Sequence, residues 1–310
     1  MKKLLPILLV FFVYNLSAQE SKIDSTLGWN INGDGALQFN NAIFSNWSKG
    51  GENSIAGSIV SNILANYKGS DFTFENSFAF GYGLIYSDEY NTRKTDDKLD
   101  FNSKFGLNLT DELNASVLLN FNTQFAVGYK YPNDSTVISN FMAPGYLNLS
   151  AGLDYKPGND LSIFLTPVSG RITFVMDQSL ADVGQYGVKA KVEDTDGNII
   201  SKGENIKMEF GANLVVNYKK EIFENVTAQT KYEMFMNYTD ENVKNRTNID
   251  VNWETIFNLK INSWLNVNLF FHLLYDNDIL VPIKDANNPD RKGRRLQFKN
   301  TNGLAISFKF

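Results

Sequence analysis

Apolar and polar residues alternate with a period of two along most of the chain. Between Leu99 and Leu109 the odd positions are mostly apolar, whereas the even positions carry Asp, Asn, Lys and Gly. Successive side chains of a β-strand point to opposite faces, so this pattern predicts a strand with one apolar and one polar face. The segment from Leu113 to Tyr129 repeats the pattern after only three residues, 110–112. The two segments therefore predict neighbouring strands joined by a tight turn.

About twelve such segments follow one another, and bacterial single-chain outer-membrane barrels have an even number of strands. The predicted fold is all-β: a transmembrane antiparallel up-and-down β-barrel with N- and C-termini on the periplasmic side. The predicted strands are 33–43, 54–68, 72–86, 98–109, 113–129, 145–155, 161–176, 205–218, 226–238, 247–261, 265–275 and 295–310.

The connections between these strands alternate in length, as expected of a barrel with short periplasmic turns and longer outer loops. The predicted inner turns are 69–71, 110–112, 156–160, 219–225 and 262–264. The predicted outer loops are 87–97, a stretch around 130–141, 177–204 and 276–294.

Aromatic residues fall on the apolar face near both ends of the predicted strands. Those at the outer ends are Tyr86, Tyr129, Tyr238 and Tyr275, and those at the inner ends are Tyr67, Tyr155, Tyr218 and Phe310. Aromatic girdles at both interfaces are typical of lipid-exposed barrels. The alternation of apolar and polar residues alone also fits a soluble barrel, in which the apolar face points inward and the polar face points to water. The two girdles and the length of the strands favour lipid on the outside.

The N-terminal residues 1–18 have two lysines, an uncharged apolar core and small residues before position 19. This layout predicts a secretory signal peptide that is cleaved after Ala18. We expect residues 19–32 to form a short periplasmic segment and residues 33–310 to form the barrel, so the predicted location is the outer membrane. No later apolar run approaches the roughly 18 residues that a spanning helix needs.

The net charge and the cysteine content limit the classes of partner and of covalent attachment that we expect for this protein. The formal net charge is -5, and it becomes -7 when Lys2 and Lys3 are removed with the signal peptide. This balance argues against a nucleic-acid partner. The chain has no cysteine, so the mature protein has neither a lipid anchor on cysteine nor a disulfide framework. The partners expected of the barrel itself are the lipids of the outer membrane.

The last predicted strand places Leu304, Ile306, Phe308 and Phe310 on its apolar face. Such a strand with a terminal phenylalanine resembles the C-terminal signal that outer-membrane barrels present to the barrel assembly machinery. That resemblance implies the assembly machinery as a second partner.

The stretch NWSKGGEN at 46–53 carries a Trp-x-x-Gly-Gly-x-Asn spacing formed by Trp47, Gly50, Gly51 and Asn53. With the signal peptide, the Asn-rich strands and SLADVGQYGV at 179–188, it resembles a Bacteroidota outer-membrane β-barrel family of unknown function, domain-of-unknown-function family 3078. The resemblance covers nearly the whole mature chain. It implies location and fold, but no catalytic residue.

From the residues alone, the same stretch is predicted to form a tight connection. Gly50 and Gly51 permit positive φ, Trp47 is suited to anchor at the interface, and Asn53 is suited to bond backbone within the turn. The alternative is a docking or ligand site at the outer rim. The turn is the favoured interpretation because Gly and Asn are ordinary turn formers.

Many positions predicted to face the barrel interior are charged. We expect neighbouring strands to present a lattice of opposite charges formed by Lys207, Glu209, Lys231, Glu233, Asp250, Glu254, Arg295 and Lys299. The lattice either fills and stiffens a narrow barrel or lines a polar path for a small solute. Filling is favoured because mixed charge without a ring of one sign argues against an ion-selective pore.

Residues for catalysis, metal binding or cofactor binding are scarce. The single histidine, His272, is predicted to face inward. In an outer-membrane phospholipase the His and Ser lie on the lipid-facing side two residues apart, whereas the positions two residues from His272 are Phe270 and Leu274. There is no second histidine, cysteine or nucleotide-binding glycine pattern. We therefore expect no cofactor, no metal and no enzyme activity.

Three hypotheses of different classes remain for the function. The first is a narrow or gated passage for small hydrophilic solutes, which is our best guess. The second is a non-catalytic scaffold barrel that binds an envelope protein partner through its outer loops, and the third is an outer-leaflet enzyme. The sequence identifies neither solute, partner nor oligomeric state. The longest loop, 177–204, fits either a plug or an outward loop.

Overall fold

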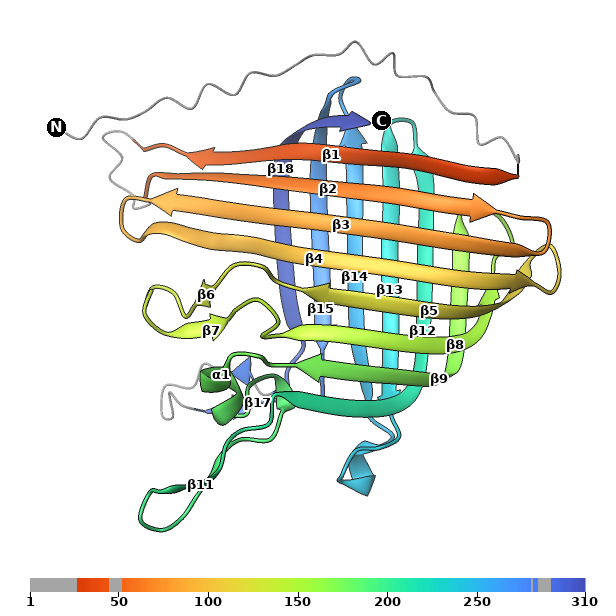
Figure 1. Cartoon of the computed structure of the whole chain (residues 1–310). Helices are drawn as coiled ribbons and strands as arrows, with labels where there is room; N and C mark the ends of the chain where they lie inside the picture. The colour runs from red at the N-terminus through yellow and green to blue at the C-terminus, as the bar shows by residue number, and fades with distance from the viewer. Residues whose placement is uncertain (1–26, 45–51, 280, 284–290, 310) are drawn as a thin grey trace.

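The computed structural model describes residues 27–44, 52–279, 281–283 and 291–309. Twelve strands form its main body: β1 (Gly28–Ala42), β2 (Ser54–Lys68), β3 (Phe72–Ser87), β4 (Asn91–Asn108), β5 (Leu113–Thr123), β8 (Gly145–Tyr155), β9 (Leu161–Phe174), β12 (Ile206–Phe223), β13 (Val226–Asn237), β14 (Ile249–Lys260), β15 (Leu265–Tyr275) and β18 (Gln297–Lys309). They close into one antiparallel barrel in the order β1-β18-β15-β14-β13-β12-β9-β8-β5-β4-β3-β2 (Figure 1). The predicted 12-stranded all-β barrel is confirmed.

The two ends of the barrel differ in their connections. At the turn end, residues 69–71, 109–112, 156–160, 224–225 and 261–264 join the strands. The opposite end, which we call the loop end, carries β6 (Gly128–Tyr129), β7 (Val137–Ser139), α1 (Gln178–Asp182), η1 (Gln185–Gly187), β10 (Val192–Glu193), β11 (Ile199–Ser201), η2 (Val243–Asn245), β16 (Val281–Pro282) and β17 (Lys292–Gly293). Among the helices that the structure describes, none has the length and apolar character needed to cross a bilayer.

Three predicted strands, 54–68, 145–155 and 265–275, coincide with β2, β8 and β15. The other boundaries shift, and two connections were predicted wrongly. The predicted outer loop 87–97 is only the turn 88–90, because β4 pairs with β3 from Asn91 onward. The predicted inner turn 219–225 is only 224–225, because β12 continues to Phe223.

Smaller shifts occur elsewhere: β1 begins at Gly28 instead of 33, and β5 ends at Thr123 instead of 129. The longer strands share a physical cause. Strand pairing depends on backbone hydrogen bonds, which do not require an apolar face. Residues 91–98 are mostly polar on both faces, so they show no alternation of apolar and polar positions. The hydrogen-bonded ladder with β3 nevertheless continues through them.

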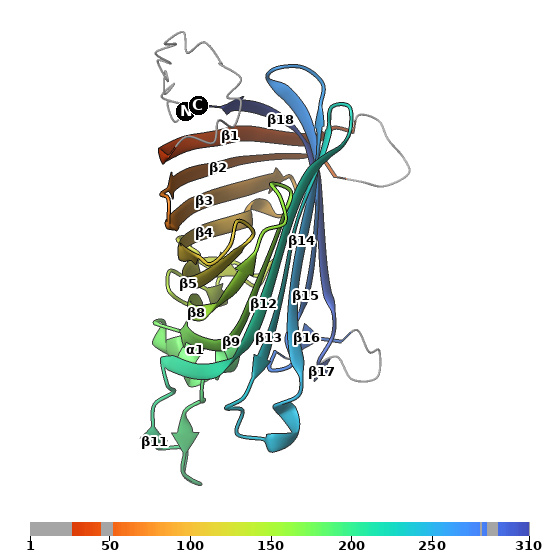
Figure 2. The same ribbon diagram turned by 90° about the vertical axis from the view of Figure 1, so that its right-hand side faces the viewer.

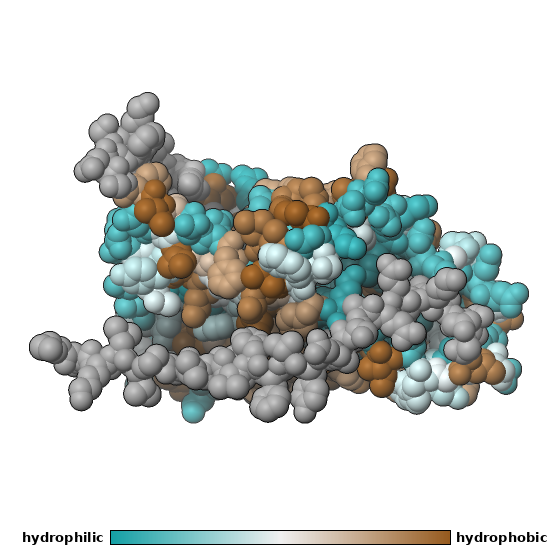
Figure 3. All heavy atoms as spheres, turned by 90° about the horizontal axis from the view of Figure 1, so that it is seen from above, coloured by the Kyte–Doolittle hydropathy of each residue, from teal (hydrophilic) through white to brown (hydrophobic). Residues whose placement is uncertain are grey.

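The outer surface of the barrel is apolar and the lumen is polar. Large apolar side chains exposed on the outer face include Ile59, Ile63, Phe101, Phe105, Val117, Leu149, Leu165, Trp253, Phe298, Leu304, Ile306 and Phe308. Figure 3 shows such side chains gathered among hydrophilic ones on one face of the molecule. Buried polar side chains on the inward positions include Asn114, Asn120, Asn148, Ser150 and Asp154. This polarity is the one that a barrel in lipid requires, and it is opposite to that of a soluble barrel.

An aromatic cluster on the outer face surrounds part of the turn end. The ring of Trp29 lies 5.5 Å from that of Tyr67 and 6.2 Å from that of Phe74. Phe72 stacks on Tyr67 at 5.3 Å and contacts Phe105 at 5.6 Å. The cluster joins β1, β2, β3 and β4 at the level where the sequence predicts the inner girdle.

The barrel turns a corner where β9 passes between β8 and β12 (Figure 2). Register shifts occur on both sides of β9, between Ala151 and Leu153 on β8 and between Gly211 and Asn213 on β12. Pro167 lies at this irregular point of β9, where the missing backbone N–H costs no ladder bond. β-Bulges bend a strand and are commonly used to curve a barrel wall.

Gly152 is required at this corner because backbone atoms lie against it. A Cβ on Gly152 would stand 2.1 Å from the Leu165 carbonyl oxygen and 2.7 Å from the Thr166 Cα. We expect Gly152→Ala to lower the free energy of unfolding by about 1–3 kcal/mol through overpacking. Urea unfolding in lipid vesicles measures this. Gly81→Ala is the matched control, since nothing lies within 3.7 Å of its Cβ position. Equal stability of the two variants would contradict the prediction.

Candidate functional site

The candidate site is the charged lumen, which contains ion pairs at three levels between the turn end and the loop end. Each charged side chain comes from an inward position of the period-two pattern or from a connection beside it. We describe the three levels in turn.

Four charged residues near the turn end form the turn-end square: Glu75, Lys104, Asp154 and Lys156. Lys104 Nζ lies 3.1 Å from Glu75 Oε2 and 2.5 Å from Asp154 Oδ2. Lys156 Nζ lies 3.3 Å from Asp154 Oδ2 and also pairs with Glu75. The Asp154 side chain is fully buried, and its second oxygen accepts a hydrogen bond from Ser162 Oγ at 2.8 Å. Each acid thus contacts both lysines, and the square links β3, β4 and the end of β8 across the lumen.

At mid-height one lysine reaches the opposite wall. Lys98 Nζ on β4 lies 3.5 Å from Glu254 Oε2 on β14 and 3.5 Å from Asp100 Oδ2 on its own strand. Five strands separate β4 from β14 in either direction around the barrel. We call Lys98 and Glu254 the transverse pair. It crosses the lumen between diametrically opposite strands.

The transverse pair lies beside water. The Lys98 side chain is 41% exposed and that of Glu254 is 24% exposed. A second cross-lumen contact joins Lys299 Nζ on β18 to Asp96 Oδ1 on β4 at 3.2 Å, with side chains 40% and 46% exposed. These exposures mean that solvent reaches the middle of the lumen.

His272 also faces the lumen at this level. Its Nε2 lies 2.7 Å from Asn252 Oδ1 and 4.0 Å from Glu254 Oε1. It is therefore hydrogen-bonded within the polar lining, as predicted for a histidine that faces inward.

The loop end of the lumen holds a third level of charges. Arg171 pairs with Asp250 at 3.2 Å, and its guanidinium carbon lies 3.8 Å from the centre of the Phe235 ring. Lys207 Nζ lies 2.9 Å from Glu209 and 2.7 Å from Asp278. These groups line a cavity of about 20 Å³. A cavity of this size has room for a water molecule.

Residues 184–188, which we call the cap, lie over this cavity. Tyr186 lines the cavity and donates its hydroxyl to the Ile138 carbonyl at 2.6 Å. Burial raises the pKa of Tyr186 to about 12, so this hydroxyl stays protonated and keeps donating at ordinary pH. Val188 packs in a buried apolar cluster with Val175 and Leu180. In this structure the predicted long loop therefore contributes a short segment that closes part of the loop end.

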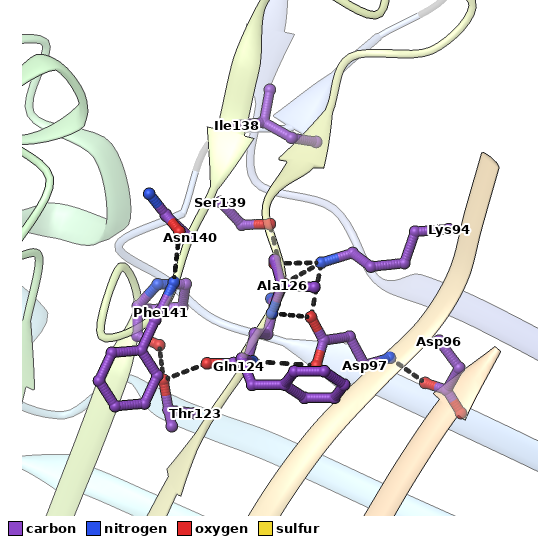
Figure 4. A network of polar contacts seen from close by, with 12 residues as sticks. Lys94, Asp96, Asp97, Thr123, Gln124, Ala126, Ile138, Ser139, Asn140 and Phe141 are labelled. Carbon is purple, nitrogen blue, oxygen red and sulfur yellow. Dashed lines mark hydrogen bonds and ion pairs between the residues drawn. The ribbon is translucent and has the colours of Figure 1, made fainter. Parts of the chain in front are cut away.

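The connection between β5 and β8 is held on the outside of the wall by a separate network (Figure 4). Lys94 Nζ lies 2.8 Å from Asp97 Oδ2 and 3.0 Å from Gln124 Oε1. Asp97 accepts hydrogen bonds from the backbone N–H groups of Phe125 and Ala126 at 3.0 and 2.9 Å. Phe125 stacks on the rings of Phe80 and Tyr82 on β3. This network supports the loop end without entering the lumen.

The predicted lattice residues lie mostly where the period-two pattern places them. Lys207 pairs with Glu209, Lys231 with Glu233 at 3.8 Å, Asp250 with Arg171, and Glu254 with Lys98. Arg295 is the exception: it was predicted on the closing strand, but β18 begins at Gln297 and Arg295 is exposed. The partners that the sequence analysis did not select are Glu75, Asp96, Lys98, Asp100, Lys104, Asp154, Lys156 and Arg171. For most of them the inward phase of their strands was the available signal, whereas Asp96 and Lys156 lay in the predicted connections 87–97 and 156–160.

The predicted motif turn is only partly described. Trp47, Gly50 and Gly51 lie outside the described residues. Asn53 accepts a hydrogen bond from the Phe44 backbone N–H at 2.7 Å and donates to Asp88 at 3.0 Å. On the closing strand, Leu304, Ile306 and Phe308 are exposed on the outer face. Phe310 lies outside the described residues.

Metal binding has no candidate in the part of the chain that the structure describes, since no group of three or more His, Cys, Asp or Glu is placed to hold an ion. The acids of the lumen are instead shared among lysines and an arginine. The chemistry available to this lining is hydrogen bonding and charge pairing with a polar solute or with water.

An apolar outer wall around a hydrated, charge-lined lumen defines a transmembrane β-barrel. A family model described as "Protein of unknown function (DUF3078)" matches residues 39–129, from β1 to β6. This agrees over those residues with the resemblance seen in the sequence. No curated protein matches the chain.

Solved structures give distant matches. An outer membrane channel from Pseudomonas putida F1 has 11% identity and a TM-score of 0.41, covering 91% of this chain and 96% of its own. The translocator domain of autotransporter NalP from Neisseria meningitidis has 9% identity and a TM-score of 0.38, covering 93% and 90%. The NanC porin has 9% identity and a TM-score of 0.36, covering 90% and 98%. Likeness at this level does not carry function from one barrel to another.

Proposed function

We propose that this protein is an outer-membrane barrel forming a narrow passage for small hydrophilic solutes, closed at mid-height by the transverse pair. The observation that carries the proposal is the solvent accessibility of that pair, since the Lys98 and Glu254 side chains are both partly exposed inside the barrel. Charges facing water across a lumen belong to a path that solutes and ions enter. They are poorly suited to a permanently filled core.

Energetics support the same choice. Replacing a buried ion pair by well-packed apolar residues is often neutral or stabilising. A barrel that served only as a filled scaffold would therefore gain nothing from crossing its lumen with lysines and acids. In a gated passage, by contrast, exposed ion pairs have a use, because they hold the walls together weakly and separate without a large cost.

Several further assignments belong to this proposal. An apolar belt around a closed barrel supports the outer membrane as the location, with the loop end outside and both termini in the periplasm. The cleaved signal peptide, the Bacteroidota origin of the motif family and recognition by the assembly machinery are parts of the same proposal. We assign no catalytic step to the barrel.

Single-channel current in a planar bilayer tests the passage. The double variant Lys98→Ala/Glu254→Ala removes both charges together, so neither is left unpaired. We expect small current steps in the wild type and severalfold larger steps in the double variant. Lys220→Ala/Asp160→Ala is the matched control, because this pair is exposed at the turn end with a 3.4 Å contact. If neither the folded wild type nor the folded lumen variant carries current, the proposed passage is wrong.

One observation favours the scaffold as a second function. The hairpin β10–β11 projects from the loop end (Figures 1 and 2), and Val192, Ile199 and Ile200 are exposed on it. An exposed apolar hairpin is suited to contact an envelope protein. Replacing residues 192–201 by an Asn-Gly turn is then expected to abolish co-purification of a stoichiometric partner. Absence of any such partner with the intact hairpin would count against the scaffold.

A further inference from the structure

The barrel closes between β1 and β18 through a short ladder of paired residues. β18 pairs with β15 from Gln297 to Ile306, but with β1 only from Leu304 to Lys309. β1 itself continues to Ala42 while pairing with β2. Figures 1 and 2 show β18 running beside β1 only near its C-terminal end. Within the described part of the chain, the β1-facing edge of residues 297–303 therefore has no strand partner.

An unpaired strand edge is costly in lipid. The edge 297–303 measures roughly 23 Å at about 3.3 Å per residue. Its flanking outward side chains, Phe298 and Leu304, are exposed and apolar, which places it within the apolar belt. Open sheet edges are not tolerated in hydrocarbon unless they are covered by protein or line a water-filled opening. The lining of the seam decides between these alternatives.

That lining is polar on both sides of the wall. On the outer face, Asn300 and Asn302 are exposed and bonded to each other at 2.9 Å, and Asn300 Nδ2 donates to the Phe270 carbonyl at 3.1 Å. On the lumen face, Lys299 and Asp96 form the cross-lumen contact whose side chains are nearly half exposed. Polar side chains on both faces of the wall favour a water-lined seam over a dry one at this position.

We propose that the seam between β1 and β18 is a side portal for single-chain zwitterionic amphiphiles. The seam lies between residues 39–44, at the end of β1 and just beyond it, and residues 297–303 of β18. The two amides and the Lys299–Asp96 pair supply donors, an acceptor and both charge signs for a zwitterionic headgroup. Phe39 and Phe298, both exposed on the outer face, flank the opening and contact the tail. The inference goes beyond the end-to-end passage, and it does not require that passage to conduct.

Photocrosslinking tests the portal in intact protein reconstituted in lipid nanodiscs. The probe is a lysophosphatidylcholine with a diazirine in its acyl chain, and peptide mapping locates the adducts. We expect severalfold more label per exposed apolar residue at Phe39 and Phe298 than on β13 and β14. The double variant Asn300→Leu/Asn302→Leu is expected to reduce the seam label to the level of those strands.

The matched control variant is Thr230→Val/Thr255→Val. This pair of hydroxyls, 2.8 Å apart, links β13 and β14 away from the seam. We expect it to leave the seam label unchanged. Label spread evenly around the barrel in the wild type, or seam label that survives the asparagine substitutions, would overturn the proposal.

Hydrogen exchange gives a second readout that does not depend on the probe. We expect the backbone amides of 297–303 that point toward β1 to exchange faster than those of β13, which is paired along both edges. Full protection of 297–303 would mean that a strand from this chain or from a second copy covers the edge, and the portal would be excluded. Current through the barrel is measured separately, so failure of the portal and failure of the passage are distinguishable.

Discussion

Replacing Asp154 by alanine is expected to lower the free energy of unfolding of the barrel by about 3–5 kcal/mol. Asp154 is fully buried at the centre of the turn-end square, where it contacts both Lys104 and Lys156. Removing it leaves two ammonium groups sharing Glu75 alone, and it removes the acceptor of the Ser162 hydroxyl. Urea titration of folded protein in lipid vesicles gives the change in free energy.

Two comparisons make this result specific. Asp160→Ala breaks an exposed turn-end pair with Lys220, and such pairs contribute about 0–1 kcal/mol. Asp154→Asn keeps the shape of the side chain and removes its charge, so we expect a loss close to that of the alanine variant if pairing dominates. Should Asp154→Ala be no less stable than Asp160→Ala, the square would have to be hydrated and weakly coupled.

Removing the cap is expected to give the largest increase in conductance at the loop end. Val175 N donates to the Asn205 carbonyl at 2.7 Å, so the two ends of the long loop are adjacent. A short Gly-Ser linker in place of residues 178–203 therefore closes the chain without moving β9 or β12. The variant loses Tyr186 from the cavity lining, and solvent gains access to Lys207 and Arg171.

The Asn-Gly replacement of residues 192–201 is the control, because it shortens the same loop and leaves the cap in place. We expect its current to equal that of the wild type. Greater current in the cap variant alone assigns the restriction to the part of residues 178–203 outside 192–201, which contains the cap. Equal currents in all three proteins would mean that the cap does not limit passage and that mid-height is the only restriction.

The strand number and the two faces of each strand were predictable from local sequence. A strand in a barrel wall contacts lipid on one side and the lumen on the other, so Phe101 and Asp100 differ in polarity because they lie on opposite faces. The same rule found Lys207, Glu209, Glu254 and Lys299. It failed between Asn91 and Asp97, where neither face of β4 is apolar and the strand is held by its backbone ladder and by polar contacts such as that of Lys94 with Asp97.

The sequence by itself determined the polarity of the wall, the approximate strands and the inward position of most charges. The tertiary structure alone decided which charges meet. Lys98 and Glu254 come from opposite sides of the barrel, and Lys299 reaches Asp96, which lies 203 residues earlier in the chain. Period-two alternation specifies a face but not a partner, because an ion pair requires two atoms within about 4 Å and that distance is set by closure and register. Among the described residues, the short ladder between β1 and β18 could not be predicted for the same reason, because strand closure is a property of the whole barrel.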